Sequence, residues 1–416
     1  MDLHAFLAAK RDRNSHSNED IAEFCRMLTS GAAEDYQVSA WLMAAYINGL
    51  EDRETAALAR AMADSGQTID LSALQKPVID KHSTGGVGDA VTPLFLPIMA
   101  ACGVTVVKMS GRGLGFTGGT LDKLSAIPNF RTDLSEAELI AIAKKVGCAW
   151  SGQTKELAPA DKILYALRDA TETVNNISLI AASIMSKKLA SGADAIVLDV
   201  KWGSGAFAKT KDEAERLSQE MIAIGEHSGK RIAAVLSEMN QPLAPAIGNA
   251  LEVKAAIAEI KSGCKSRLGS VTVELCRKAL ALAGKSADPM QVTQDGRALE
   301  KMKEWIAAQG GDARVVDDPS LLPAAAVTAA VKSESQGVVS AFDCEALGEI
   351  ARALGAGRFR AEDEIDLGVG IELHVELGRR IAKGDLLFTI HARSAEDADV
   401  ATRSVRTAIM IKADLC

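Results

Sequence analysis

The chain of 416 residues has few aromatic side chains and no excess of positive charge. Phenylalanine, tryptophan and tyrosine together make up 4% of the residues, and the formal net charge is −8. Surfaces that bind nucleic acid combine basic patches with aromatic stacking, so this composition argues against a nucleic-acid partner. A small anionic ligand remains compatible with it, because such a ligand needs only a local basic pocket.

Cysteine motifs and long apolar runs are missing as well. The seven cysteines form no CxxC pair, and their odd number favours buried or idle thiols over a disulfide framework or a zinc site. No apolar run approaches the ~18 residues of a membrane span. The N-terminal residues become charged too early for a signal peptide. We therefore expect a cytoplasmic protein with no membrane segment.

Hydrophobic periodicity predicts three regions of different character. Residues 1–66 are predicted to form four short amphipathic helices, and residues 156–190 return to helix. Between and after these segments, strands alternate with helices, which favours a largely parallel sheet covered by helices. Predicted strands lie at 77–81, 104–109, 195–201 and 231–239. Residues 318–336 have the proline and serine content of a linker, and short apolar alternations follow it.

Two glycine-rich loops each follow a predicted strand and lead into a helix: KHSTGGVGD (81–89) and SGRGLGFTGGTLDKL (110–124). Ligands of α/β sheets bind beyond the carboxyl ends of strands, and free N–H groups at a helix start attract anions. The polar residues around the loops are Lys81, Ser83, Thr92, Ser110 and Thr120. One ammonium and four hydroxyls make a suitable shell for phosphate. Tight turning of the backbone alone is the alternative interpretation.

Two other phosphate-binding motifs do not fit these loops. A P-loop requires GxxxxGK[ST], which the chain lacks. Gly113, Gly115 and Gly118 match GxGxxG, but no acidic residue follows at the distance that a dinucleotide site requires. The loops therefore favour a small phosphate ligand over a nucleotide cofactor.

A predicted helix over 178–190 carries Ser183 and Lys187 four residues apart, so both project from one face. Arg168 lies on the preceding predicted helix. A lone lysine on a helix is usually solvated. A serine, a lysine and a neighbouring arginine are compatible with that interpretation and with a shared polar pocket.

Several motifs, in this order along nearly the whole chain, resemble the thymidine and pyrimidine-nucleoside phosphorylase family. They are KHSTGGVGD, SGRGLGFTGGTLDKL, APADKILYALRDAT, SIMSKKLASGADAIVLDVKWGSGAF and GNALEVKAAI. The resemblance implies a homodimer that catalyses reversible phosphorolysis. In this reaction phosphate attacks the anomeric carbon of a pyrimidine nucleoside and yields free base and (deoxy)ribose 1-phosphate with inversion.

The resemblance also implies the fold, an α/β class built from three parts. A discontinuous α domain on the nucleobase side (1–66 plus 156–190) packs against an α/β domain on the phosphate side (76–155 plus 191–330). A small C-terminal α+β domain (340–416) completes the expected architecture. The sheet domain is of the nucleoside phosphorylase and phosphoribosyltransferase type.

Matching positions assign roles to individual residues. The five loop residues named above correspond to the family's phosphate ligands. The pyrimidine ligands correspond to His82, Arg168, Ser183 and Lys187. His82 either stabilises charge on the leaving base when protonated or orients the base when neutral. Lys108 matches the branch with a lysine near the ribose, which favours acceptance of both uridine and thymidine.

Four positions depart from the family pattern. Phe116 replaces the histidine of GHTGGT beside the nucleoside, and Ser125 replaces the glutamate that ends DKLE. Some relatives bind a structural potassium ion through the GGVGD loop, using backbone oxygens and a glutamate just after GNALEVK. Ala90 and Ala255 occupy two of these ligand positions here. We therefore expect no cofactor or metal, with inorganic phosphate as co-substrate and the potassium ion doubtful.

Two competing functions remain compatible with these residues. A phosphoribosyltransferase of the same architecture would use a pyrophosphorylated sugar with magnesium, which an acidic pair usually holds; the loops offer no convincing pair. A catalytically impaired relative would bind nucleosides without turnover, as the changes at Phe116 and Ser125 would allow.

Overall fold

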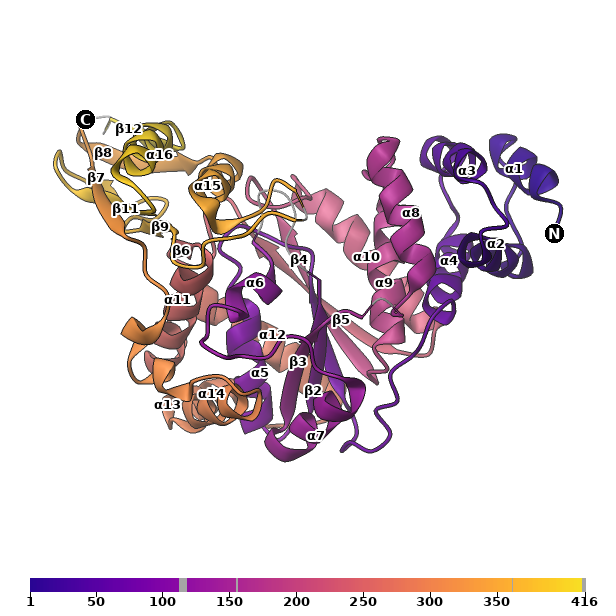
Figure 1. The fold of residues 1–416 in the computed structure, drawn as a ribbon, viewed down its shortest axis with the longest axis horizontal. Coiled ribbons are helices and arrows are strands. Elements are labelled where there is room, and N and C mark those ends of the chain that lie inside the picture. The colour runs from indigo at the N-terminus through magenta and orange to yellow at the C-terminus, as the bar shows by residue number, and fades with distance from the viewer. Residues whose placement is uncertain (112–117, 155, 361, 414–416) are drawn as a thin grey trace. The chain divides into compact units, whose positions relative to one another are not determined.

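The computed structural model describes residues 1–111, 118–154, 156–360 and 362–413 (Figure 1). The chain divides into two compact units. The first comprises residues 1–82, 153–198 and 215–234, and the second comprises residues 83–152, 199–214 and 235–416. Within the described residues, no helix combines the length and the apolar character that a bilayer crossing needs.

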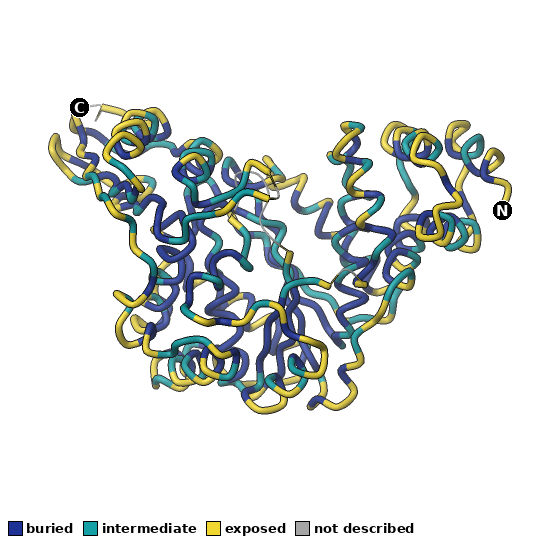
Figure 2. Tube along the Cα trace, in the orientation of Figure 1, coloured by how far each residue is buried: buried dark blue, intermediate teal, exposed yellow. Residues whose placement is uncertain are grey.

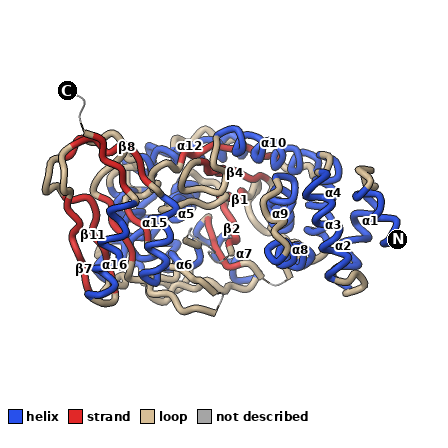
Figure 3. The backbone as a smooth tube through the Cα atoms, turned by 90° about the horizontal axis from the view of Figure 1, so that it is seen from above, coloured by secondary structure: helices blue, strands red, loops and turns tan. Residues whose placement is uncertain are grey.

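The first unit is built mainly from helices, which Figure 3 shows in blue. They are α1 (Leu3–Arg11), α2 (Asn18–Ser30), α3 (Asp35–Asn48), α4 (Asp52–Asp64), α8 (Pro159–Ala170), α9 (Ile177–Ala190) and most of α10 (Lys211–His227). The four helices predicted for residues 1–66 are thus confirmed. Ser17 caps α2 by accepting a hydrogen bond from the Asp20 N–H, as its position before a helical run predicts.

Aromatic rings fill the core of the N-terminal bundle. Phe6 stacks on His16, and the Trp41 indole donates to His16 Nε2 at 3.0 Å. Because burial disfavours the imidazolium, the pKa of His16 falls to about 4. The ring is therefore a neutral acceptor that fixes the packing of α1 against α3.

A five-stranded sheet has the strand order β3-β2-β1-β4-β5. Its strands are β1 (Ile79–Ser83), β2 (Val106–Ser110), β3 (Cys148–Gly152), β4 (Ala195–Trp202) and β5 (Arg231–Glu238). The predicted strands are confirmed to within a few residues, and β2 pairs with β3 in parallel. Strand β4 is buried along almost its whole length, as expected where helices cover a mostly parallel sheet (Figure 2).

The second unit also contains helices, which alternate with these strands or follow them along the chain. They are α5 (Val91–Ala101), α6 (Thr120–Leu124), α7 (Glu136–Val146), α11 (Asn249–Lys261), α12 (Arg267–Ala283), α13 (Pro289–Gln294) and α14 (Arg297–Ala308), with short 3₁₀ turns η1 (Ala313–Val316) and η2 (Pro319–Leu321). Ser135 and Glu138 cap α7 reciprocally, which confirms the predicted capping box. Helix α5 is buried all round, so its apolar sequence reflects a core position.

The C-terminal lobe contains two small sheets, of order β10-β8-β12 and β6-β9-β11-β7. Its elements are β6 (Ala246–Ile247), β7 (Val327–Lys332), β8 (Gly337–Phe342), α15 (Cys344–Ala351), η3 (Arg352–Ala356), β9 (Gly370–Leu373), β10 (Arg380–Ile381), β11 (Leu386–Ala392), α16 (Ala395–Thr407) and β12 (Ile409–Lys412). The prediction of a linker over 318–336 is wrong for β7. That strand pairs antiparallel with β11, a partner too distant in sequence for local composition to reveal.

Candidate active site

The first glycine loop (residues 84–90) connects β1 to α5 and is held in shape by its own polar groups. Gly88 has φ +71°, and a Cβ there would lie 3.0 Å from the Ala246 carbonyl oxygen. Only glycine meets both conditions without strain. At the loop entry, the Ser83 hydroxyl accepts from the Gly85 N–H at 3.2 Å. The glycines therefore serve a tight turn with a close backbone approach.

Asp89 is the organising side chain of this loop, and the sequence analysis assigned it no role. Its carboxylate accepts from Ser83 Oγ at 2.6 Å and from the Val91 N–H at 3.2 Å, and it lies 3.8 Å from Lys201 Nζ. Lys123 Nζ donates to the Asp89 carbonyl oxygen at 2.8 Å. Two ammonium groups thus face Asp89 and hold the start of α5 in place.

Lys201 belongs to a wholly buried charge network in the second unit. Its ammonium lies 2.8 Å from Asp199 Oδ2, while Ser237 donates to Asp199 Oδ1 at 2.7 Å. The Lys201 N–H also donates to Thr84 Oγ1 at 2.8 Å. Strand β4 therefore holds the glycine loop in two ways. The Lys201 ammonium lies near Asp89, and the Lys201 N–H donates to Thr84.

Ser110, at the end of β2, has its hydroxyl oriented by a buried tryptophan. Trp150 Nε1 donates to Ser110 Oγ at 3.0 Å. Because an indole N–H only donates, the Ser110 O–H is not used in this bond. It can donate a hydrogen bond to an anion. Ser83 differs, since its proton is directed to Asp89 and reaches an anion only after the hydroxyl turns.

The remaining predicted phosphate-side residues occupy defined positions on neighbouring elements. Lys81 is fully buried in β1, where alternation along the strand puts it on the same face as Ser83. Thr92 is buried in the first turn of α5, and Thr120 opens α6 after Gly119. Lys108, the predicted ribose-side residue, is buried in β2.

In the first unit, the structure brings together Ser183 and Lys187 as their spacing predicts. Lys187 Nζ donates to Ser183 Oγ at 3.1 Å and forms an ion pair with the Asp161 carboxylate of α8. Asp161 was missed in the sequence analysis. Its position seven residues before Arg168 puts both on one face of α8, which is the signal that could have found it. We call Asp161, Arg168, Ser183 and Lys187 the base-side cluster.

Lys187 and Ser183 have more hydrogen-bond donors than their contacts within this cluster use. An ammonium has three N–H groups, and two of those on Lys187 are directed to Asp161 and Ser183. Ser183 accepts from Lys187, so its own proton can be donated elsewhere. The Lys187 side chain is 24% exposed, so part of it is in contact with solvent.

Arg168 is buried at the end of α8 and donates to three backbone carbonyls. Nε, Nη1 and Nη2 reach the carbonyl oxygens of Thr173, Leu179 and Val174 at 3.3, 3.0 and 2.6 Å. Desolvation lowers the pKa of Arg168, although a guanidinium stays charged at neutral pH. Three of its five N–H groups shape the connection between α8 and α9, and two remain for a ligand.

Lys188, next to Lys187 on α9, has a different environment. It is buried and donates to Asp80 Oδ2 of β1 at 2.9 Å, and Asp80 is itself fully buried. This pair ties α9 to the strand that carries Lys81 and His82. His82 is half-buried in β1, on the strand face opposite Lys81 and Ser83.

The four positions that depart from the family pattern lie in different surroundings. Phe116 lies outside the described residues. Ser125 follows α6, and its hydroxyl donates to the Leu121 carbonyl oxygen at 2.8 Å, one turn earlier. Ala90 is buried before α5 and Ala255 half-buried in α11, and neither offers a side-chain oxygen. These two positions therefore do not fit a potassium site that draws on side-chain ligands there.

Glu252, on the same helix as Ala255, is already engaged with a cation. Its carboxylate lies 2.6 Å from Lys123 Nζ, and both side chains are buried. Burial nevertheless raises the pKa of Glu252 above its usual value. Across the described parts of the chain, no three His, Cys, Asp or Glu side chains converge as a metal site would need.

Comparison with known proteins agrees with this arrangement. The model of the glycosyl transferase family a/b domain matches residues 75–308, and that of the helical bundle domain of the same family matches residues 4–66. The model of the pyrimidine nucleoside phosphorylase C-terminal domain matches residues 338–412. The pyrimidine-nucleoside phosphorylase of Bacillus subtilis (strain 168) is 48% identical over 97% of this chain and 95% of its own length. The chain belongs to the pyrimidine-nucleoside phosphorylase family.

Other relatives give the same family. The pyrimidine-nucleoside phosphorylase of Geobacillus stearothermophilus is 47% identical over 94% of this chain and 92% of its own. Among solved structures, the anthranilate phosphoribosyltransferase from Thermus thermophilus has a TM-score of 0.59 and 18% identity, covering 75% of this chain and all of that one. This last likeness shows the fold alone. The resemblance predicted from the motifs and the predicted fold class are both confirmed.

Proposed function

We propose that this chain catalyses the reversible phosphorolysis of pyrimidine nucleosides, with inorganic phosphate as co-substrate. The family assignment over nearly the whole chain is the observation that carries the proposal. The base-side cluster supports it, because two cations with donors to spare suit a leaving base whose carbonyl oxygens become negative. A phosphoribosyltransferase is not favoured, since the likeness to one is confined to the fold.

The proposed roles follow from the groups present. Phosphate would accept from the hydroxyls of Ser83, Thr92, Ser110 and Thr120 and pair with Lys81. As the C–N glycosidic bond breaks, Arg168 and Lys187 would stabilise the departing base, and Ser183 would donate to it. His82 is the further base-side residue that we propose. Lys108 would lie near the ribose, and we propose that uridine, deoxyuridine and thymidine are all accepted.

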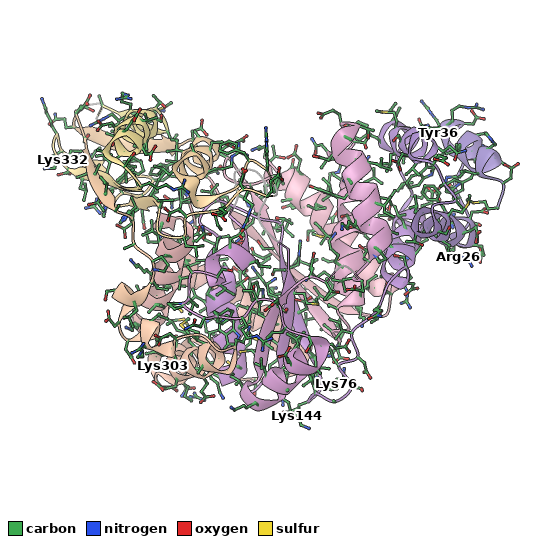
Figure 4. All side chains as sticks on the ribbon, viewed as in Figure 1. Arg26, Tyr36, Lys76, Lys144, Lys303 and Lys332 are labelled. Atoms are coloured by element: carbon green, nitrogen blue, oxygen red, sulfur yellow. The ribbon has the colours of Figure 1, made fainter. Side chains whose placement is uncertain are left out.

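We also infer that the enzyme is a cytoplasmic homodimer. Helix α3 exposes Tyr36 (labelled in Figure 4) and Ile47 at 72% and 69%, and Tyr46 and Met43 are partly exposed on it. Tyr165 of α8 adds a further exposed ring. Apolar side chains gathered on one helix are typical of a subunit contact. The described cysteines are free thiols, as suits a reducing compartment.

The test is a panel of nucleosides incubated with and without inorganic phosphate, with release of free base followed by ultraviolet absorbance. We expect phosphate-dependent release from uridine, deoxyuridine and thymidine in the presence of a magnesium chelator. Binding without release would contradict catalysis and support the impaired relative. Turnover that requires a pyrophosphorylated sugar and magnesium would instead indicate the phosphoribosyltransferase.

A second measurement addresses the ion. Because Ala90 and Ala255 bring no side-chain oxygen ligand, replacing potassium by sodium at constant ionic strength is expected to change kcat/KM by less than about twofold, well under 1 kcal/mol. The control is the substitution Ala255→Glu, which supplies a carboxylate at the position where some relatives have a glutamate ligand. A large loss of activity of the unaltered chain in sodium would contradict the expectation.

A further inference from the structure

A cavity of about 420 Å³ lies in the first unit, among α2, α4 and the end of α10. Four alanines, Ala22, Ala56, Ala57 and Ala61, leave room where larger side chains would fill the space. No residue of the base-side cluster lines it, so it is a separate feature from the proposed catalytic groups. Its volume is within the range of small-molecule sites, roughly 300–1,000 Å³.

Three arginines line this cavity: Arg26 of α2, and Arg53 and Arg60 of α4. Arg53 and Arg60 are seven residues apart and therefore project from the same face of α4. Guanidinium groups present paired N–H donors that match the oxygens of a phosphate. The cavity lining thus combines four small apolar side chains, here called the alanine floor, with three arginines.

Arg53 is held in place by neutral acceptors. Nη1 donates to Asn18 Oδ1 at 2.9 Å, and Nη2 donates to the His16 carbonyl oxygen at 2.7 Å. Over the part of the chain that the structure describes, no carboxylate lies within ion-pair distance of Arg53. Its charge is therefore positioned without being neutralised, which is the condition for binding an anion from solution.

The other two arginines have exposed partners. Arg60 pairs with Asp64 at 2.8 Å, and Arg26 pairs with Glu23 at 2.7 Å. Exposed pairs of this kind are weak, so a phosphate can compete for both guanidinium groups. Asp64 also lines the cavity, and three arginines against one aspartate leave a net charge of +2 on the lining.

His227, at the end of α10, completes the wall. Its Nδ1 lies 2.8 Å from the Ala223 carbonyl oxygen, which can only accept, so Nδ1 carries a proton. Nε2 is then the ring nitrogen left for a ligand. A phosphate monoester has both acceptor oxygens and a hydroxyl-bearing or aromatic remainder to contact this ring and the alanine floor.

We propose that this cavity binds a phosphate monoester at a site separate from the phosphorolysis groups. The arginines hold the phosphate, and the alanine floor contacts the sugar or nucleoside attached to it. A nucleoside 5′-monophosphate and a sugar phosphate share this chemistry. The proposal concerns binding alone and does not depend on the proposed function.

The test is isothermal titration of the full chain with uridine 5′-monophosphate, ribose 5-phosphate and, as the phosphate-free control, uridine. The double variant Arg53→Gln/Arg60→Gln is compared with Arg11→Gln, which alters an exposed arginine of α1 outside the cavity. Binding at the base-side cluster is common to all samples, so a difference between variants reports on the cavity.

We expect the double variant to weaken monoester binding by about tenfold or more, as loss of charge-assisted hydrogen bonds does, and to leave uridine binding unchanged. Binding of both monoesters assigns recognition to the phosphate group, and binding of uridine 5′-monophosphate alone assigns it to nucleotides. Superimposable isotherms for the double variant and Arg11→Gln would overturn the proposal. If the double variant fails to fold, Arg26→Gln takes its place.

Discussion

The base-side cluster and the first glycine loop differ in the groups that they present to a charged ligand. The cluster presents side chains: Lys187 and Arg168 are cations whose donors are only partly used. The loop presents backbone and hydroxyl groups, and its one charged residue, Asp89, is held by Lys123 and Lys201 of neighbouring elements. In the proposed assignment, the cations that stabilise charge developing on the base are carried by helices, whereas the loop shaped by glycine suits phosphate, an anion that arrives fully charged.

The clearest contrast is between the environments of two consecutive lysines. Lys187 is partly exposed and donates to Ser183, whereas Lys188 is buried against Asp80. In the proposed assignment, the same residue type serves the ligand at one position and the architecture at the next.

Substituting Lys188→Met is expected to lower the free energy of unfolding by about 3–5 kcal/mol, because it leaves the buried Asp80 carboxylate without this cation. Urea denaturation followed by circular dichroism measures the change. Lys209→Met removes an exposed pair with Glu345 and should cost at most about 1 kcal/mol. Equal losses in the two variants would show that burial of the Lys188 pair does not matter.

Substituting Lys187→Ala or Arg168→Ala is expected to reduce kcat by about a hundredfold or more, since each removes a partner of the charge that develops on the base. Steady-state phosphorolysis of uridine measures the loss. The control is Lys162→Ala, which alters an exposed lysine on α8. Because Arg168 also shapes a connection, circular dichroism must first confirm that its variant is folded. Activity within a few-fold of the unaltered chain would contradict the base-side assignment.

Substituting Ser83→Ala or Ser110→Ala is expected to raise KM for phosphate by about tenfold, the effect of losing one hydrogen bond to a charged group. KM for the nucleoside should stay within about twofold, because the loop hydroxyls are assigned to phosphate. Ser404→Ala alters an exposed hydroxyl on α16 and serves as control. A rise confined to the nucleoside KM would reverse the assignment of the loop.

Local sequence patterns predicted the parts of the molecule that depend on neighbours in the chain. The Ser183–Lys187 spacing, the glycine loop after β1 and the capping box of α7 are all set within a few residues. Each of these patterns has one structural solution at short range, a helix face or a turn. They could therefore be identified before any tertiary contact was known.

The missed features depend on pairing between distant segments. Trp150 reaches Ser110 because β3 lies beside β2 in a register that pairs Ser110 with Gly152. Asp80 meets Lys188 across 108 positions of the sequence. Strand β7 exists because β11 offers it a partner. Local composition does not predict such pairings, because the free energy that stabilises them comes from tertiary packing between distant segments.

The smallest expected effect concerns specificity at Phe116. Substituting Phe116→His restores the family's polar ring and should change the relative kcat/KM of uridine, deoxyuridine and thymidine by about threefold, less than 1 kcal/mol, because one altered contact modifies recognition without supplying catalysis. Competition assays with paired nucleosides measure these ratios directly. Phe207→His, at an exposed ring, is the control. Unchanged ratios would make Phe116 a bystander and would leave recognition of the base to the helix-borne side chains.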